Sequence, residues 1–87
     1  MDGVKKILVV DDEADICNIL KFNLDKAGYE TATALSAEDA LMRGIIGYDL
    51  VLLDVMMEGI SGFQMAQMMK KNPESAKIPI IFITAKD

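Results

Sequence analysis

The sequence contains no histidine, only one cysteine and no long hydrophobic run. The lack of histidine excludes histidine-based catalysis and histidine metal ligands within this chain. The single cysteine, Cys17, cannot form an internal disulfide, which agrees with a reducing compartment, and we interpret it as an inert packing or surface residue rather than a nucleophile. No apolar run approaches the roughly 20 residues that span a bilayer, and the N-terminus does not resemble a signal peptide. We therefore expect a cytoplasmic protein without membrane contacts.

Basic clusters and glycine-rich phosphate loops are also absent. The net charge is −5, and the lysine pairs at 5–6 and 70–71 are far apart in the sequence, so direct nucleic-acid binding is not expected. No G-x-G-x-x-G follows an apolar run and no G-x-x-x-x-G-K-[ST] occurs, which excludes the dinucleotide-binding and P-loop NTPase classes. With 87 residues, 52% of them hydrophobic, the chain suits one globular domain over residues 1–87.

Short apolar runs alternate with amphipathic segments along the chain. The runs predict strands at residues 6–10, 29–34, 48–55 and 78–84, of which the second is the least apolar and is expected near a sheet edge. The segments between them predict helices at about 13–27, from residue 36 onward, and at 62–71. Helices that connect strands in this way are crossovers, so the predicted class is α/β, a parallel sheet with helices on both faces.

Individual residues predict where the helices end and which faces they bury. Gly28 is expected to end the first helix, and Ser36 to cap the second. Pro73 forbids continuation of the third. The predicted inner positions are Ile16, Ile19, Leu20 and Leu24 in the first helix, Ala37, Ala40, Leu41 and Ile45 in the second, and Met65, Met68 and Met69 in the third.

Four polar residues stand at the carboxyl ends of predicted strands. They are Asp11, Asp12, Asp54 and Thr84, and parallel strands should bring them to one rim of the sheet. Three neighbouring carboxylates repel one another, and a divalent cation is the natural compensation. Oxygen ligands alone favour a hard ion, and so few carboxylates suit Mg²⁺ (or Mn²⁺) better than a closed Ca²⁺ cage. The simpler alternative is that each aspartate only caps a helix or forms a turn.

Three segments carry a family resemblance: ILVVDDEADI, DLVLLDVMMEGISGFQM and IPIIFITAKD. They resemble the receiver domain of two-component response regulators (CheY-like, flavodoxin-like fold), along the whole chain. The resemblance implies the strand order 2-1-3-4. It also implies that Asp54 accepts a phosphoryl group from a phosphohistidine of a sensor histidine kinase or phosphotransfer protein. By the same resemblance Asp11, Asp12, Asp54 and the backbone carbonyl of Met56 hold Mg²⁺, and Thr84 is the switch hydroxyl that contacts the phosphoryl group.

The chain also departs from the family pattern. Glu58 stands where the family usually has proline, and it adds a charge near the expected site. We expect the chain to stop after the fourth strand, without the family's last helix-strand-helix portion and its invariant lysine. We expect Lys86 to be able to reach the site, although it does not align with that lysine. An uncovered fourth strand is an apolar sheet edge, so we expect either association through it, with a second copy or a partner strand, or a fragment that is poorly stable alone. The missing lysine is expected to impair switching.

Three functions remain after these steps. The first is a phosphoacceptor signalling module with at most weak autophosphorylation and autodephosphorylation activity, which is not an enzyme in the usual sense. The second is an interaction or oligomerisation module, or a receiver fragment, that keeps the acidic pocket without signalling. The third is a metal-dependent phosphatase, which we disfavour because that class commonly needs a second aspartate where Met56 stands.

Overall fold

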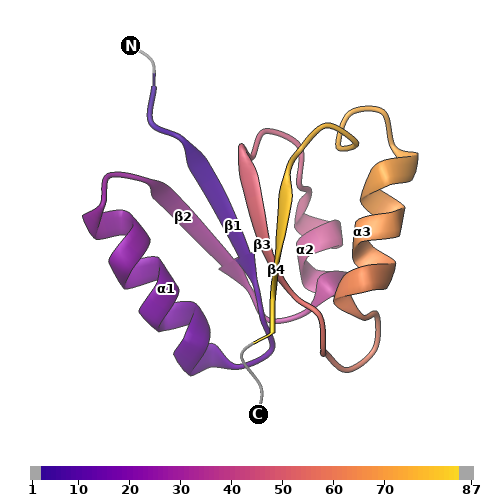
Figure 1. Cartoon of the computed structure of the whole chain (residues 1–87), viewed down its shortest axis with the longest axis horizontal. Helices are drawn as coiled ribbons and strands as arrows, with labels where there is room; N and C mark the ends of the chain where they lie inside the picture. The colour runs from indigo at the N-terminus through magenta and orange to yellow at the C-terminus, as the bar shows by residue number, and fades with distance from the viewer. Residues whose placement is uncertain (1–2, 85–87) are drawn as a thin grey trace.

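A computed structural model describes residues 3–84 as a four-stranded parallel sheet with three helices (Figure 1). The elements are β1 (Lys6–Val10), α1 (Ala14–Lys26), β2 (Glu30–Ala34), α2 (Ala37–Arg43), β3 (Leu50–Asp54), α3 (Gly62–Lys71) and β4 (Ile80–Ile83). The strand order is β2-β1-β3-β4, with all pairs parallel. The predicted class, element order and strand order are confirmed. Among the helices within residues 3–84, none is long and apolar enough for a membrane span.

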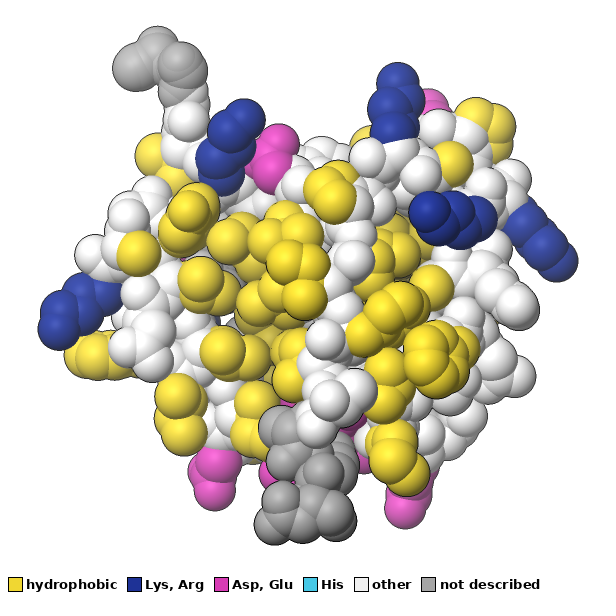
Figure 2. Space-filling model, in the orientation of Figure 1, with side chains coloured by type: hydrophobic (Ala, Val, Ile, Leu, Met, Phe, Trp, Pro, Cys, Tyr) yellow, Lys and Arg dark blue, Asp and Glu magenta, His cyan; other side chains and the backbone are white. Residues whose placement is uncertain are grey.

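Figure 1 shows α1 on one face of the sheet and α2 and α3 on the other. Each face carries its own cluster of buried apolar residues. Ile7 and Val9 point toward α1, where they meet Cys17. Leu8 and Val10, their neighbours in the same strand, point toward α2 and α3. This alternation explains why β1 is continuously apolar rather than alternating with polar residues. Figure 2 shows that hydrophobic side chains also remain visible on both sides of β4.

The helix ends follow the capping residues that the sequence predicts. After α1, Gly28 has a φ of 104° and donates to the Asp25 carbonyl at 3.0 Å, while the Tyr29 N–H donates to the Leu24 carbonyl at 3.0 Å. These two bonds form a Schellman motif, which favours glycine at that position. At the start of α2, the Ser36 hydroxyl accepts the Asp39 N–H at 3.0 Å. The predicted roles of Gly28 and Ser36 are confirmed.

Two predicted inner positions are wrong, and β4 is shorter than predicted. Ile19 is 60% exposed, whereas Cys17 takes an inner position at 2%. Because a helix turns by about 100° per residue, Cys17 and Ile19 lie on opposite sides of the apolar face of α1, and the sheet covers only the side with Cys17. Met65 and Met69 are buried, but Met68 is exposed. The sequence predicts a strand from residue 78, yet β4 begins only at Ile80.

Candidate acidic metal centre

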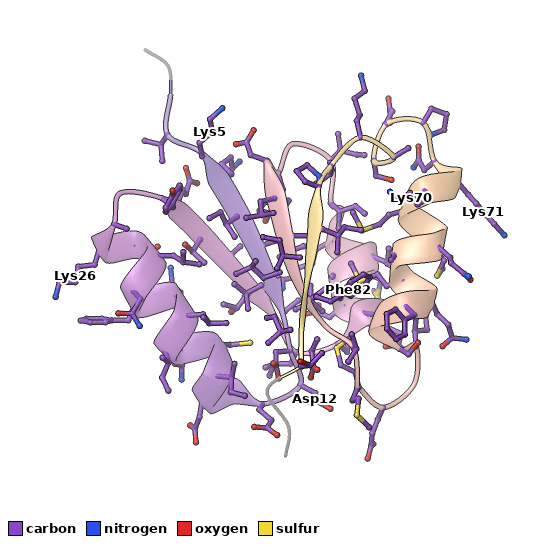
Figure 3. All side chains as sticks on the ribbon, in the orientation of Figure 1. Lys5, Asp12, Lys26, Lys70, Lys71 and Phe82 are labelled. Carbon is purple, nitrogen blue, oxygen red and sulfur yellow. The ribbon has the colours of Figure 1, made fainter. Side chains whose placement is uncertain are left out.

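Asp11 and Asp54 meet because β1 and β3 are adjacent and in register. Val10 pairs with Leu53, so the next residue of each strand emerges at the same rim. Asp12 follows, and one carboxylate oxygen of each of the three aspartates lies within 4.8 Å of the others. Asp11 and Asp54 are each only 1% exposed, whereas Asp12 is open to solvent. Figure 3 shows Asp12 at the end of the sheet where β4 finishes.

Backbone hydrogen bonds orient the two buried carboxylates. The Glu13 N–H donates to Asp11 Oδ1 at 2.9 Å, and the Met56 N–H donates to Asp54 Oδ1 at 3.1 Å. In each case the donor is two residues beyond the aspartate, which is the geometry of an Asx turn. Each aspartate therefore ends its strand, shapes the following turn and still contributes a carboxylate to the cluster. The turn role and the metal-binding role are compatible.

Three of the other predicted site residues lie in the segments that follow β4 and β3. Thr84 follows β4 and is exposed. Asp54 pairs with Ile83 on the neighbouring strand, so Thr84 is the next residue toward the rim after the partner of Asp54. Met56 lies in the loop after β3. Glu58 is exposed in the same loop and is not one of the three clustered acids. Lys86 lies outside the described residues.

Gly62 supports the site, although the sequence only marks it as the start of a helix. Its N–H donates to the Val55 carbonyl at 3.3 Å. A Cβ atom at Gly62 would lie 2.2 Å from the carbonyl oxygen of Asp54 and 2.9 Å from its carbonyl carbon. The start of α3 therefore packs directly on the backbone of Asp54. The available signal was glycine at the first position of a helix, where its low propensity calls for a packing reason.

The loop between β3 and α3 is also tied to α2. Glu38 Oε2 accepts the Ile60 N–H at 3.2 Å. At the end of the loop, the Ser61 hydroxyl accepts the Gln64 N–H at 3.1 Å and the Gln64 side chain accepts the Ser61 N–H at 2.9 Å. This reciprocal pair is a capping box. The loop that carries Met56 and Glu58 is thus held in place at the end that leads into α3.

Cys17 lies behind the cluster and does not add a ligand to it. Its Sγ donates to the backbone carbonyl of Asp11 at 3.3 Å. Burial raises the pKa of the thiol, and the negative charge of Asp11 raises it further. The thiol therefore stays protonated near neutral pH, and it is neither a nucleophile nor a thiolate ligand. Of the two roles expected for Cys17, packing and surface, its burial selects packing.

The donor chemistry of the cluster selects the type of ion. Three carboxylates within 4.8 Å of one another repel, and two of them are buried, where repulsion is less screened by water. An oxygen-only donor set suits a hard divalent cation such as Mg²⁺. The residues present therefore fit such an ion.

Comparison with known proteins agrees with this geometry. Residues 7–87 match the response regulator receiver domain family. The chain is 43% identical over 81 residues to the uncharacterized transcriptional regulatory protein YrkP of Bacillus subtilis, and 39% identical over 84 residues to the alkaline phosphatase synthesis transcriptional regulatory protein PhoP of the same species. These alignments cover 93% and 95% of this chain. The chain spans about a third (34%) of the length of each relative.

Solved structures show the same fold. A response regulator receiver protein domain from Methanoculleus marisnigri has a TM-score of 0.89 at 38% identity, covering 97% of this chain and 69% of that one. The response regulator TrrA from Thermotoga maritima, solved in complex with Mg²⁺ and BeF, has a TM-score of 0.80 at 42% identity, covering 97% and 72%. The family match, the strand order and the acidic rim agree with one another, and the chain belongs to the response regulator receiver domain family.

Proposed function

We propose that this chain is a phosphoacceptor module in which Asp54 receives a phosphoryl group from the phosphohistidine of a sensor histidine kinase or phosphotransfer protein. The observation that carries the proposal is the cluster of three carboxylates within 4.8 Å at the carboxyl ends of adjacent strands. Such a cluster is electrostatically costly unless a cation joins it. Asp54 ends β3, which lies between β1, followed by Asp11, and β4, followed by Thr84.

In this proposal, Asp11, Asp12, Asp54 and the backbone carbonyl of Met56 hold Mg²⁺ or Mn²⁺. When bound, the cation neutralises carboxylate repulsion and the charge that develops on phosphoryl oxygens. The oxygen-only donor set supports this assignment, as does the relative from Thermotoga maritima that was solved with Mg²⁺ and BeF. Glu58 and Lys86 are proposed as accessory groups at the edge of the site.

The proposed reaction is a direct displacement at phosphorus. A carboxylate oxygen of Asp54 forms a bond to phosphorus while the bond between phosphorus and the histidine nitrogen breaks, and that nitrogen keeps the electron pair. The product is an acyl phosphate on Asp54. The Met56 N–H, which donates to Asp54 Oδ1 at 3.1 Å, holds the carboxylate in a fixed orientation. The Thr84 hydroxyl is proposed to donate to a phosphoryl oxygen of the product.

The proposal treats residues 1–87 as one receiver domain rather than a turnover enzyme. Self-phosphorylation and self-dephosphorylation are expected to be weak at most. The single buried cysteine suits a reducing, cytoplasmic setting.

Labelling with a small phosphodonor tests the proposal. Incubation with acetyl phosphate and Mg²⁺ should add one phosphoryl group per chain, as measured by intact mass, and chelation of Mg²⁺ should prevent it. Asp54→Asn should abolish the addition. Asp49→Asn is the matched control, since Asp49 precedes the other end of β3 and its carboxylate only accepts the Lys6 N–H at 2.8 Å. Equal labelling of Asp54→Asn and the unmodified sequence would exclude Asp54 as the acceptor.

A further inference from the structure

The loop between β3 and α3 contains two adjacent residues that do little to fix its backbone. Gly59 has a φ of 77°, which glycine adopts readily, but glycine also loses the most conformational freedom when a chain becomes ordered. Glu58 precedes it and is exposed, and its φ is free, whereas a proline there would fix φ. The same loop carries Met56. Contacts with the rest of the domain are therefore needed to hold this loop in one shape.

The start of α2 lies beside the loop. Strands β2 and β3 both run parallel to β1, so the segments that follow them emerge at the same end of the sheet (Figure 1). Met57 is 9% exposed and belongs to the same core cluster as Ala37 and Ala40, the buried residues of α2. Ile60 packs against that cluster as well. The apolar residues of the loop thus bring its backbone close to the first turn of α2.

Glu38 makes a polar contact between α2 and this loop. Its Oε2 atom accepts the Ile60 N–H at 3.2 Å, across 22 residues of sequence. A Cβ atom at Gly59 would lie 2.5 Å from the same oxygen, which is closer than real Cβ atoms come. The absence of a side chain at Gly59 therefore leaves the space that the carboxylate occupies. A hydrogen bond to an ionised acceptor is stronger than one between neutral groups.

The next residue of α2, Asp39, makes a different contact. Both acids are exposed and lie in the first turn of the helix, where negative charge is favourable. The Asp39 carboxylate pairs with the Arg43 guanidinium of the same helix at 3.2 Å, whereas the Glu38 carboxylate bonds to the loop. The two residues therefore carry the same charge at neighbouring positions, and they differ in whether that charge reaches the loop.

We propose that Glu38 is a positioning residue for the metal site. Its carboxylate holds the loop after β3 so that the Met56 carbonyl stays directed at the clustered acids. The loop is fixed near the strand by the Met56 N–H, which donates to Asp54 Oδ1 at 3.1 Å, and Glu38 fixes it four residues further on. Groups that orient a metal ligand without touching the metal affect metal affinity strongly. This inference rests on the proposed role of Met56 and the three aspartates as metal ligands.

Magnesium titration of the chain without a phosphodonor, followed by calorimetry, tests this role. Glu38→Ala should weaken Mg²⁺ binding by about tenfold. Glu38→Gln loses the charge but keeps an oxygen that can accept the Ile60 N–H, so it should retain most of the affinity of the unmodified chain. Asp39→Ala removes a charge from the same turn, and it should bind Mg²⁺ as Glu38→Gln does. Equal weakening by all three variants would assign the effect to charge alone and overturn the positioning role.

Amide hydrogen exchange in the absence of metal tests the contact itself. The Ile60 amide should exchange faster in Glu38→Ala than in the unmodified chain, and it should not change in Asp39→Ala. The rates are compared with that of the buried Val9 amide in β1, which reports opening of the whole domain. Unchanged exchange of Ile60 in Glu38→Ala, measured in this way, would overturn the proposal.

The two proposals fail in different ways. Full Mg²⁺ affinity in Glu38→Ala, beside normal binding by the unmodified chain, would overturn the positioning role and leave the metal site intact. Absence of Mg²⁺ binding by the unmodified chain would instead overturn the metal site, and the positioning role with it.

Discussion

Replacing Gly62 with alanine should damage the site through a steric contact alone. The added Cβ would lie 2.2 Å from the Asp54 carbonyl oxygen, whereas ordinary contact begins at 3.4 Å. The start of α3 and the backbone of Asp54 must therefore separate by about 1.2 Å (3.4 − 2.2). Gly62 is not among the glycines with positive φ, so backbone strain adds nothing to this effect.

The expected loss of stability is moderate, because two effects oppose each other. Overpacking typically costs about 1–3 kcal/mol, and replacing glycine by alanine in a helix returns roughly 0.5–1 kcal/mol. We expect a net loss of about 1–2 kcal/mol, which lowers the melting temperature of a domain this size by about 4–16 °C. The effect on function should be larger, since a displacement near 1 Å at a reacting group costs about 100-fold in rate.

The assay compares phosphorylation rates at a temperature where every variant is fully folded. Gly62→Ala should react with acetyl phosphate about 100-fold more slowly than the unmodified chain. Gly44→Ala is the control: its φ of 94° strains an alanine, but its Cβ would have no atom within 4 Å. That variant should lose stability without losing rate. If Gly62→Ala keeps both its rate and its melting temperature, the contact with Asp54 does not constrain the site.

Two further predictions concern charge and protonation. Asp12→Asn removes one of three clustered carboxylates, so the stabilisation of the chain by Mg²⁺ in thermal melts should shrink; an unchanged or larger Mg²⁺ effect would contradict the metal site. The second concerns Cys17, whose pKa burial holds above its ordinary value of 9.0. Between pH 9.0 and the raised pKa, the folded chain therefore keeps a proton that the unfolded chain releases. The resulting contribution to the free energy of unfolding is fully present below pH 9.0 and is lost as pH rises through the raised pKa. Urea denaturation across that pH range should show that the free energy of unfolding falls more steeply with pH in the unmodified chain than in Cys17→Ala. Parallel pH curves for the two chains would refute the raised pKa of Cys17.

The sequence predicted the fold because its signals are local and agree with one another. Apolar runs such as the one in β1 end at turn residues, and caps such as Ser36 and Gly28 mark the helix boundaries. Which side of α1 faces the sheet depends on tertiary packing, however. The stripe of apolar residues in α1 is wide enough to include Ile19, and only the packing of the helix on the sheet leaves Ile19 exposed.

The hydrogen bonds that two helix cations make to the outer edge of β2 could not be predicted from the sequence either. Lys21 and Arg43 come from different helices, and each bonds a carbonyl ten residues away along the chain. On the sequence alone they are ordinary helix-surface cations, and only the packed structure shows that they occupy one edge of the sheet. The hydrogen bonds of these two cations to β2 therefore depend on how the helices pack beside the sheet.

The acidic cluster was predictable because it depends on one register. Once β1 and β3 are parallel neighbours, pairing of Val10 with Leu53 puts Asp11 and Asp54 side by side, and no long-range adjustment is needed. A slip of one residue would turn the apolar residues of β1 to the wrong layers, so core packing and the site enforce the same alignment. No comparable sequence pattern predicts the role of Gly62. Its role follows from the distance between a helix start and a strand end, and that distance is fixed only when α3 packs against the sheet.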